Sequence, residues 1–132
     1  MTATLTVRDE TTSSFDEDHV FLLDLPSERV TVEQLIRTRV RREVEDYNAS
    51  TSEHFKGLVQ PSDAERTLNG FKVRKGRRID PDEQCGKAVE AFGRNGFILL
   101  VDDRQAEKLD EESEVRPGTT VTFLELVPLV GG

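Results

Sequence analysis

The carboxyl end of the chain is the part of the sequence best suited to chemistry. It reads Leu129-Val130-Gly131-Gly132 and follows Pro128, which cannot donate a hydrogen bond to a sheet. Glycine has no Cβ, so such a tail is thin enough to thread a narrow channel and to pass close to catalytic groups. An unhindered terminal carboxylate can attack the α-phosphate of ATP to give an acyl-adenylate, which a thiol or sulfide can then attack. The tail would be a substrate, and the catalysis would belong to another enzyme.

The charge balance narrows the classes of partner. The chain has 132 residues, with 18 Lys and Arg against 26 Asp and Glu, and its formal net charge at pH 7 is -8. Non-specific binding to nucleic acid or to an anionic membrane needs excess positive charge. We therefore expect neither nucleic acid nor a membrane as a partner, whereas this charge suits docking onto a basic protein surface.

The length predicts one domain, because domains typically hold about 100–200 residues. The longest apolar run, residues 97–101, is far too short to span a bilayer, and the N-terminus lacks the basic start and apolar stretch of a secretory signal. The one cysteine, Cys85, cannot form an internal disulfide or a multi-cysteine zinc site. We therefore expect a cytoplasmic protein that binds no metal or cofactor of its own.

Two short strands are predicted near the N-terminus. Residues 4–8 alternate polar and apolar side chains, and residues 20–25 form an apolar run that ends at Pro26. The polar residues 9–18 between them are expected to form a loop. Neighbouring short strands joined in this way favour an antiparallel hairpin.

The clearest helix begins after Thr31. Thr31 and Gln34 have the spacing of a capping box, in which each side chain bonds the other residue's backbone N–H. The apolar side chains that follow recur at helical spacing and would pack on a sheet. They are Val32, Leu35, Ile36, Val40, Val44 and Tyr47. The arginines between them are expected to form a solvated face.

Residues 49–79 show no sustained periodicity and are expected to form an insert. Within them, Asn69-Gly70 is typical of a hairpin turn. The basic residues 71–78 have two interpretations: a strand edge protected by charge, or a contact with an acidic surface on a partner. A second helix is expected to follow, with Pro81 in its first turn.

The last third predicts three strands. Residues 97–101 are typical of a buried strand, and a short strand is expected at residues 106–109. Residues 116–119 carry Pro and Gly at the central positions of a type II turn. Residues 120–126 have apolar side chains on both faces, which favours a central strand. The element order predicts an α+β fold in which a helix packs across a mixed sheet and the final strand lies beside the first, in parallel.

The sequence of this last third, FILLVDDRQ…LDEESEVRPGTTVTFLELVPLVGG, resembles the end of β-grasp ubiquitin-like proteins and sulfur carriers. The shared pattern is a strand with a polar turn, a Pro-Gly turn, a Val-x-Phe strand and a terminal diglycine. The resemblance implies a single β-grasp domain over residues 1–132 with an insertion at about residues 49–79, a second helix and an exposed tail at residues 127–132. The tail departs from ubiquitin because it has no arginine, which brings it closer to sulfur-carrier tails.

The resemblance implies that the functional position is Gly132, preceded by Gly131, and that the protein is itself not an enzyme. An adenylating enzyme of the ubiquitin-activating type would use ATP and magnesium to activate Gly132. In a modifier, a conjugating enzyme then passes the carboxyl group to a target protein, and a metallopeptidase can accompany the system, as in bacterial operons linked to antiviral defence. In a sulfur carrier, the carboxyl group becomes a thiocarboxylate for cofactor or tRNA thiolation.

Size favours the modifier, because the insert and the second helix add surface that a sulfur shuttle does not need. A third alternative is a β-grasp interaction module that conjugates to nothing. Four residues near the tail are the candidates for docking a partner: Leu126, Pro128, Leu129 and Val130. The acidic residues 110–114 either steer a basic partner or form a solvated turn.

Overall fold

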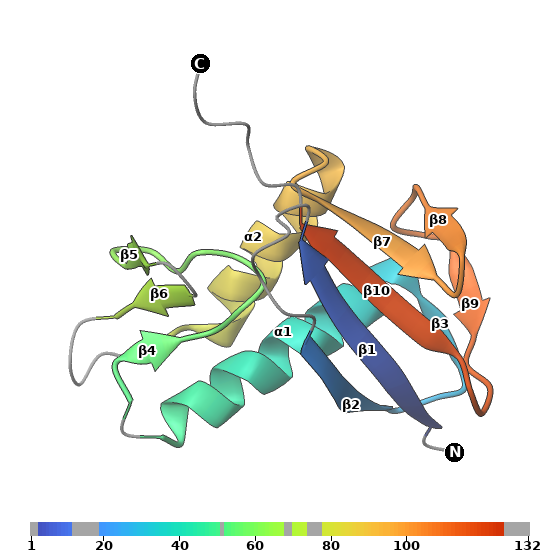
Figure 1. Ribbon diagram of the computed structural model, residues 1–132, viewed down its shortest axis with the longest axis horizontal. Coiled ribbons are helices and arrows are strands. Elements are labelled where there is room, and N and C mark those ends of the chain that lie inside the picture. The colour runs from blue at the N-terminus through green and yellow to red at the C-terminus, as the bar shows by residue number, and fades with distance from the viewer. Residues whose placement is uncertain (1–2, 12–18, 51, 68–69, 74–77, 126–132) are drawn as a thin grey trace. The chain divides into compact units, whose positions relative to one another are not determined.

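A computed structural model of the chain describes residues 3–11, 19–50, 52–67, 70–73 and 78–125 (Figure 1). The chain divides into two compact units. The sheet unit comprises residues 1–35 and 92–132, and the insert unit comprises residues 36–91. Neither described helix is long and apolar enough to cross a lipid bilayer.

The sheet unit is built on a mixed five-stranded sheet with the order β2-β1-β10-β7-β8 (Figure 1). Its strands are β1 (Ala3–Thr11), β2 (His19–Leu25), β7 (Phe97–Val101), β8 (Arg104–Ala106) and β10 (Thr120–Glu125). β1 pairs with β2 antiparallel and with β10 parallel, and β10 pairs with β7 on its other side. These pairings confirm the predicted hairpin and the predicted central, parallel final strand.

Two boundaries in this sheet differ from the sequence prediction. β1 continues through Thr11, so residues 9–11, expected in a loop, are strand residues paired with the end of β10. The short strand expected at residues 106–109 lies at Arg104–Ala106 instead, because Asp102 adopts a positive φ of 54° and the chain turns back directly after β7.

Alternation of side chains places one face of the sheet in the core. Leu5, Val7, Leu99, Val121 and Phe123 are all buried on this face. The ring of Phe97 contacts the rings of Phe92 and Phe123, with centroids 5.9 and 5.7 Å away. Each fully buried side chain of this size stabilises the fold by about 1.5–3 kcal/mol, so the core side of β10 fixes that strand firmly.

The sheet unit holds a second, two-stranded sheet that the sequence analysis missed. β3 (Arg29–Thr31) and β9 (Glu112–Glu114) pair antiparallel. Each has only three residues, and β9 contains no apolar residue, so neither is long or apolar enough to show the alternation that identifies a strand. The acidic residues 110–114, expected either to steer a partner or to form a turn, therefore include a strand.

Helix α1 (Val32–Asn48) begins in the sheet unit with the predicted capping box. The N–H of Gln34 donates to the Thr31 hydroxyl at 3.1 Å, and the N–H of Thr31 donates to the Gln34 side-chain oxygen at 2.8 Å. The N–H groups of Val32 and Glu33 donate to the carbonyls of Glu111 and Leu109. These bonds satisfy the first turn of the helix, which has no acceptors of its own.

Thr31→Ala removes the side-chain half of the capping box and should lower the free energy of unfolding by about 1 kcal/mol. Thr31→Ser keeps the hydroxyl and should retain most of that stability. Urea denaturation of both variants measures the difference. Equal stability of the alanine and wild-type proteins would contradict a role for this cap.

The insert unit contains the rest of α1, a three-stranded sheet of order β4-β6-β5, and α2 (Pro81–Gly93) as far as Ala91. The strands are β4 (His54–Phe55), β5 (Glu65–Thr67) and β6 (Gly70–Lys72). The antiparallel pairing of β5 with β6 confirms the predicted hairpin, and α2 begins at Pro81 as predicted. The Phe55 ring lies between those of Tyr47 and Phe71, with centroid distances of 5.5 and 6.5 Å.

One arginine of the predicted solvated face is buried. The Arg39 side chain is 4% exposed and pairs with Glu43, whose side chain is 13% exposed. The other carboxylate oxygen of Glu43 accepts the N–H of Leu58 at 3.0 Å. Glu43 therefore neutralises a buried cation and anchors the loop after β4, two roles that helical periodicity does not reveal.

Candidate functional site

The residues predicted to carry the function lie outside the described part of the chain. They are Leu126, Pro128, Leu129, Val130, Gly131 and Gly132. The structure does describe Glu125, the last residue before them. Glu125 is paired with Thr11 of β1 on one side and with Phe97 of β7 on the other. The described chain thus ends on a strand residue held from both sides.

The opposite end of β10 is held as firmly. The N–H of Thr120 donates to the Asp102 carboxylate at 3.1 Å, and the N–H of Asp102 donates to the Thr120 carbonyl at 2.7 Å. Just before β10, Gly118 has a φ of 91°, and the N–H of Thr119 donates to the Arg116 carbonyl at 2.9 Å. This geometry matches the predicted type II turn. β10 is therefore a rigid support for whatever follows Glu125.

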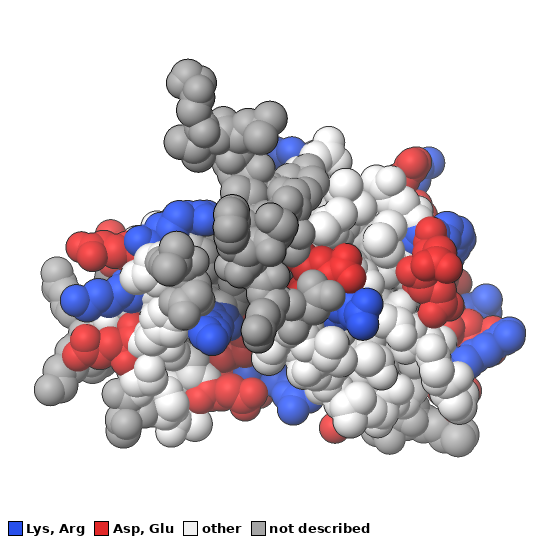
Figure 2. All heavy atoms as spheres, viewed as in Figure 1, with Lys and Arg blue, Asp and Glu red and all other residues white. Residues whose placement is uncertain are grey.

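The outer face of the sheet, opposite the core, carries apolar side chains around β10. Leu124 lies between Glu10 of β1 and Ile98 of β7, and Thr122 lies beside Leu100. Ile98, Leu100 and Leu124 are partly exposed. Uncharged atoms cover most of the surface over β10, β7 and β2 (Figure 2). This outer face could dock a protein surface immediately beside the end of β10.

The edge strand β2 extends the apolar character of the outer face. Val20 and Leu22 are 51% and 60% exposed, and they lie opposite Arg8 and Thr6 of β1. Neither residue is among the docking candidates that the sequence predicts, all of which lie next to the diglycine. They could have been identified from the alternation of side chains along each strand, because every second residue faces the core and the residues between face outwards.

The acidic residues of the chain are concentrated in the sheet unit. Residues 1–35 and 92–132 hold 16 of the 26 Asp and Glu but only 6 of the 18 Lys and Arg. Long-range attraction would therefore bring a basic partner to this unit more readily than to the insert unit.

One of these acids, Glu111, has a local structural role. Its carboxylate accepts the backbone N–H groups of Glu107 and Lys108 at 2.9 and 3.0 Å, and these bonds lower the pKa of Glu111 below its usual 4.5. The carboxylate thereby closes the loop that supplies two carbonyl acceptors to the first turn of α1. The Glu111 carboxylate therefore serves to hold this loop in place.

Glu111→Gln should destabilise the protein at pH 7, and the difference from wild type should shrink in acid. A lowered folded-state pKa means that the ionised carboxylate adds stability above its unfolded pKa, and this stability is lost as pH falls through the folded value. Denaturation midpoints measured from pH 7 downwards test this. Glu107→Gln, which removes an exposed carboxylate nearby, is the control. A difference that grows in acid would contradict the assignment.

The described residues offer little other chemistry. No group of three or more His, Cys, Asp or Glu in the described ranges is placed to hold a metal ion. Cys85 is fully buried, its thiol lies 3.5 Å from the Arg37 carbonyl oxygen, and burial raises its pKa. A raised pKa disfavours the nucleophilic thiolate at neutral pH. The candidate site is therefore the end of β10 with the outer face around it. Comparison of the chain with protein-family models, curated proteins and solved structures gives no match.

Proposed function

We propose that the protein is a ubiquitin-like modifier of the β-grasp class, activated at the carboxylate of Gly132 and conjugated to target proteins. The observation that carries the proposal is the position of β10, the last described strand, in the centre of a mixed sheet and parallel to β1. This pairing is what the resemblance to β-grasp proteins leads one to expect. The seven residues after Glu125 carry no charged side chain and end in Gly131-Gly132.

The chemistry is a transfer of the Gly132 carboxyl group. A carboxylate oxygen attacks the α-phosphorus of ATP on an activating enzyme with magnesium, and pyrophosphate leaves. A cysteine thiolate of an enzyme attacks the acyl-adenylate and AMP leaves. An amine of the target then attacks the thioester, forms an amide and releases the thiol. The absence of a side chain at Gly131 and Gly132 lets each attacking group reach the carbonyl.

The outer face suits the docking that this transfer requires. An activating enzyme must hold the modifier while its tail reaches the nucleotide, and a rigid apolar surface beside the origin of the tail provides such a hold. Leu124 and Ile98 lie one residue from the end of their strands, next to Glu125. The insert unit adds its own three-stranded sheet, which offers conjugating enzymes further surface.

The second candidate is a sulfur carrier, favoured by the tail sequence. Residues 126–132 lack the basic side chains of a ubiquitin tail. In this reaction hydrosulfide attacks the acyl-adenylate, AMP leaves, and Gly132 ends in a thiocarboxylate. The carrier requires an activating enzyme but no conjugating enzyme, so the two candidates differ in their products.

An N-terminally tagged full chain, expressed in its own host, separates the candidates. The modifier gives a ladder of higher-mass conjugates on a blot, and deletion of Gly132 abolishes the ladder. The control is Gly86→Ala, at a helix position where an added Cβ meets no atom within 4 Å; this variant should keep the ladder.

Other outcomes decide against the modifier. A ladder that persists after deletion of Gly132 would show that conjugation does not use this carboxylate. A species heavier by the difference between sulfur and oxygen, without a ladder, identifies the carrier. Partner binding that is unchanged by the deletion, with neither product, identifies an interaction module.

A further inference from the structure

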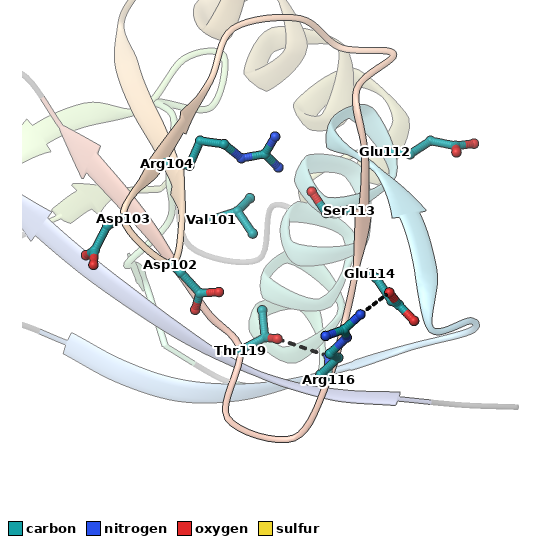
Figure 3. Close-up of a pocket in the computed structure, with 9 residues that line it drawn as sticks. All are labelled: Val101, Asp102, Asp103, Arg104, Glu112, Ser113, Glu114, Arg116 and Thr119. Atoms are coloured by element: carbon teal, nitrogen blue, oxygen red, sulfur yellow. Dashed lines mark hydrogen bonds and ion pairs between the residues drawn. The ribbon is translucent and has the colours of Figure 1, made fainter.

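A hollow of about 630 Å³ lies in the sheet unit between the β7–β8 hairpin and β9 (Figure 3). Val101 and Arg104 line one side, and residues 112–114 line the other. Arg116 and Thr119 lie at its lower end. The hollow is open to solvent and not an enclosed cavity.

The free edge of β9 borders this hollow. Among the described strands, β9 pairs with β3 alone, and the hollow lies on its other side (Figure 3). Val30 lies opposite Ser113, and the hydrogen bonds that flank this pair join Val32 to Glu111 and Val115 to Glu28. In an antiparallel ladder alternate residues direct both backbone groups to the partner. The N–H and C=O groups of Glu112 and Glu114 therefore point away from β3.

Ser113 adds a polar side chain to the lining of the hollow. Its side chain belongs to a residue that is 8% exposed, and its hydroxyl points into the hollow (Figure 3). Within the described residues this hydroxyl has no hydrogen-bond partner. Arg104 reaches into the same space from the opposite side (Figure 3). A hydroxyl and a guanidinium directed at one space can form hydrogen bonds with the backbone of a bound segment.

The acidic side chains around the hollow favour a positively charged binding segment. Residues 102–116 hold seven Asp or Glu against three Lys or Arg. Glu112 and Glu114 have side chains 57% and 56% exposed, paired with Arg29 at 3.4 Å and with Arg116 at 2.8 Å. Ion pairs so exposed to water are weak, so an incoming cation can replace or share them.

We propose that this hollow receives an extended segment of a partner protein, which adds a strand to the free edge of β9. Its backbone bonds the outward N–H and C=O groups of Glu112 and Glu114. Lys or Arg side chains at alternate positions lie opposite Glu112 and Glu114, because residues directly across a ladder share a face. The residue between them is small, since it meets Ser113 and Arg104 inside the hollow. This surface functions whether or not Gly132 is activated.

A blocked synthetic peptide, Thr-Val-Lys-Ser-Lys-Val-Thr, tests the proposal with the full-length protein. Titration followed by NMR should show saturable shifts at residues 112–114, and the amides of Glu112 and Glu114 should become protected from hydrogen exchange. Glu112→Arg with Glu114→Arg should weaken binding by roughly tenfold or more, because two attractive cross-strand pairs become repulsive. Both side chains are more than half exposed, so the variant should keep the wild-type NMR spectrum elsewhere.

Matched controls separate strand addition from simple charge attraction. Glu45→Arg, an exposed glutamate on α1, should leave the affinity unchanged. The same peptide with alternate backbone amides N-methylated keeps its charge but cannot pair with β9, and it should not bind. Equal binding of the methylated peptide, or of a peptide with Glu in place of both Lys, would overturn the proposal. Saturable NMR shifts of the same amides on titration with inorganic phosphate, together with loss of peptide binding, would identify an anion site instead.

Discussion

Replacing Glu43 by alanine should lower the free energy of unfolding by about 3–5 kcal/mol, the usual cost of removing one partner of a buried ion pair. Arg39 then keeps a buried guanidinium without the carboxylate that it contacts, and the N–H of Leu58 loses its acceptor. Both effects act in the insert unit, so α1 and the loop after β4 should loosen together.

Urea denaturation measures this loss, and Glu45→Ala is the matched control. Glu45 lies two residues away on the same helix and is exposed, so its removal should change stability by no more than about 0.5 kcal/mol. Glu43→Gln keeps an acceptor for Leu58 and should lie between the two. A loss for Glu43→Ala as small as that of the control would show that the Arg39–Glu43 pair does not stabilise the unit.

Gly57→Ala should lower stability by about 1–3 kcal/mol or more, because the added methyl group has no room. A Cβ on Gly57 would overlap the ring of Phe55 and lie 2.8 Å from a carboxylate oxygen of Glu43. Phe55 is buried between two other rings and cannot move away cheaply.

Gly86→Ala is the same substitution at another position, but it should raise the free energy of unfolding instead of lowering it. Gly86 lies inside α2, and an added Cβ there meets nothing within 4 Å. Alanine is favoured over glycine in a helix by about 1 kcal/mol, so this variant should be stabilised. Thermal or urea denaturation of the pair is the test. A Gly57→Ala variant that is as stable as the wild-type protein would contradict the close packing at Gly57.

The elements set by local rules could be predicted from the sequence. Thr31 and Gln34 mark the start of α1 because a capping box needs only four neighbouring residues. The parallel pairing of β1 with β10 followed from topology, since a helix between two strands allows a parallel connection. Pro81 marked the first residue of α2 for the same local reason.

The missed features depend on residues far apart in the sequence. β3 and β9 are strands because each has the other as partner, 83 residues apart at Val30 and Ser113. Arg39 is indistinguishable from its neighbouring arginines until Glu43 and Leu58 are brought to it. The side chain of Asn48 exchanges two hydrogen bonds of 2.9 Å with the backbone of Ile79, which lies 31 residues further along the chain.

The residues of the candidate site also divide into those that the local sequence identifies and those that only the folded structure identifies. Gly131 and Gly132 could be selected by residue type alone, and they remain a prediction outside the described residues. The outer face around Leu124 could be identified only from the register of three strands. Residues 97–101 are all apolar, so their sequence does not show which side chains face outwards. The free edge of β9 could not be predicted, because β9 contains no apolar residue and its sequence is not recognisable as a strand.

The most direct test of the central claim is the identification of the bond at Gly132. Glu125 is the last acidic residue, so digestion after glutamate releases residues 126–132 as one unit, whereas trypsin has no Lys or Arg to cleave beyond Arg116. Mass spectrometry of tagged protein from its own host should then find target peptides in which a lysine carries the Leu126–Gly132 heptapeptide through an isopeptide bond. Recovery of residues 126–132 with a free Gly132 carboxylate alone, under conditions that express the activating and conjugating enzymes, would contradict the account.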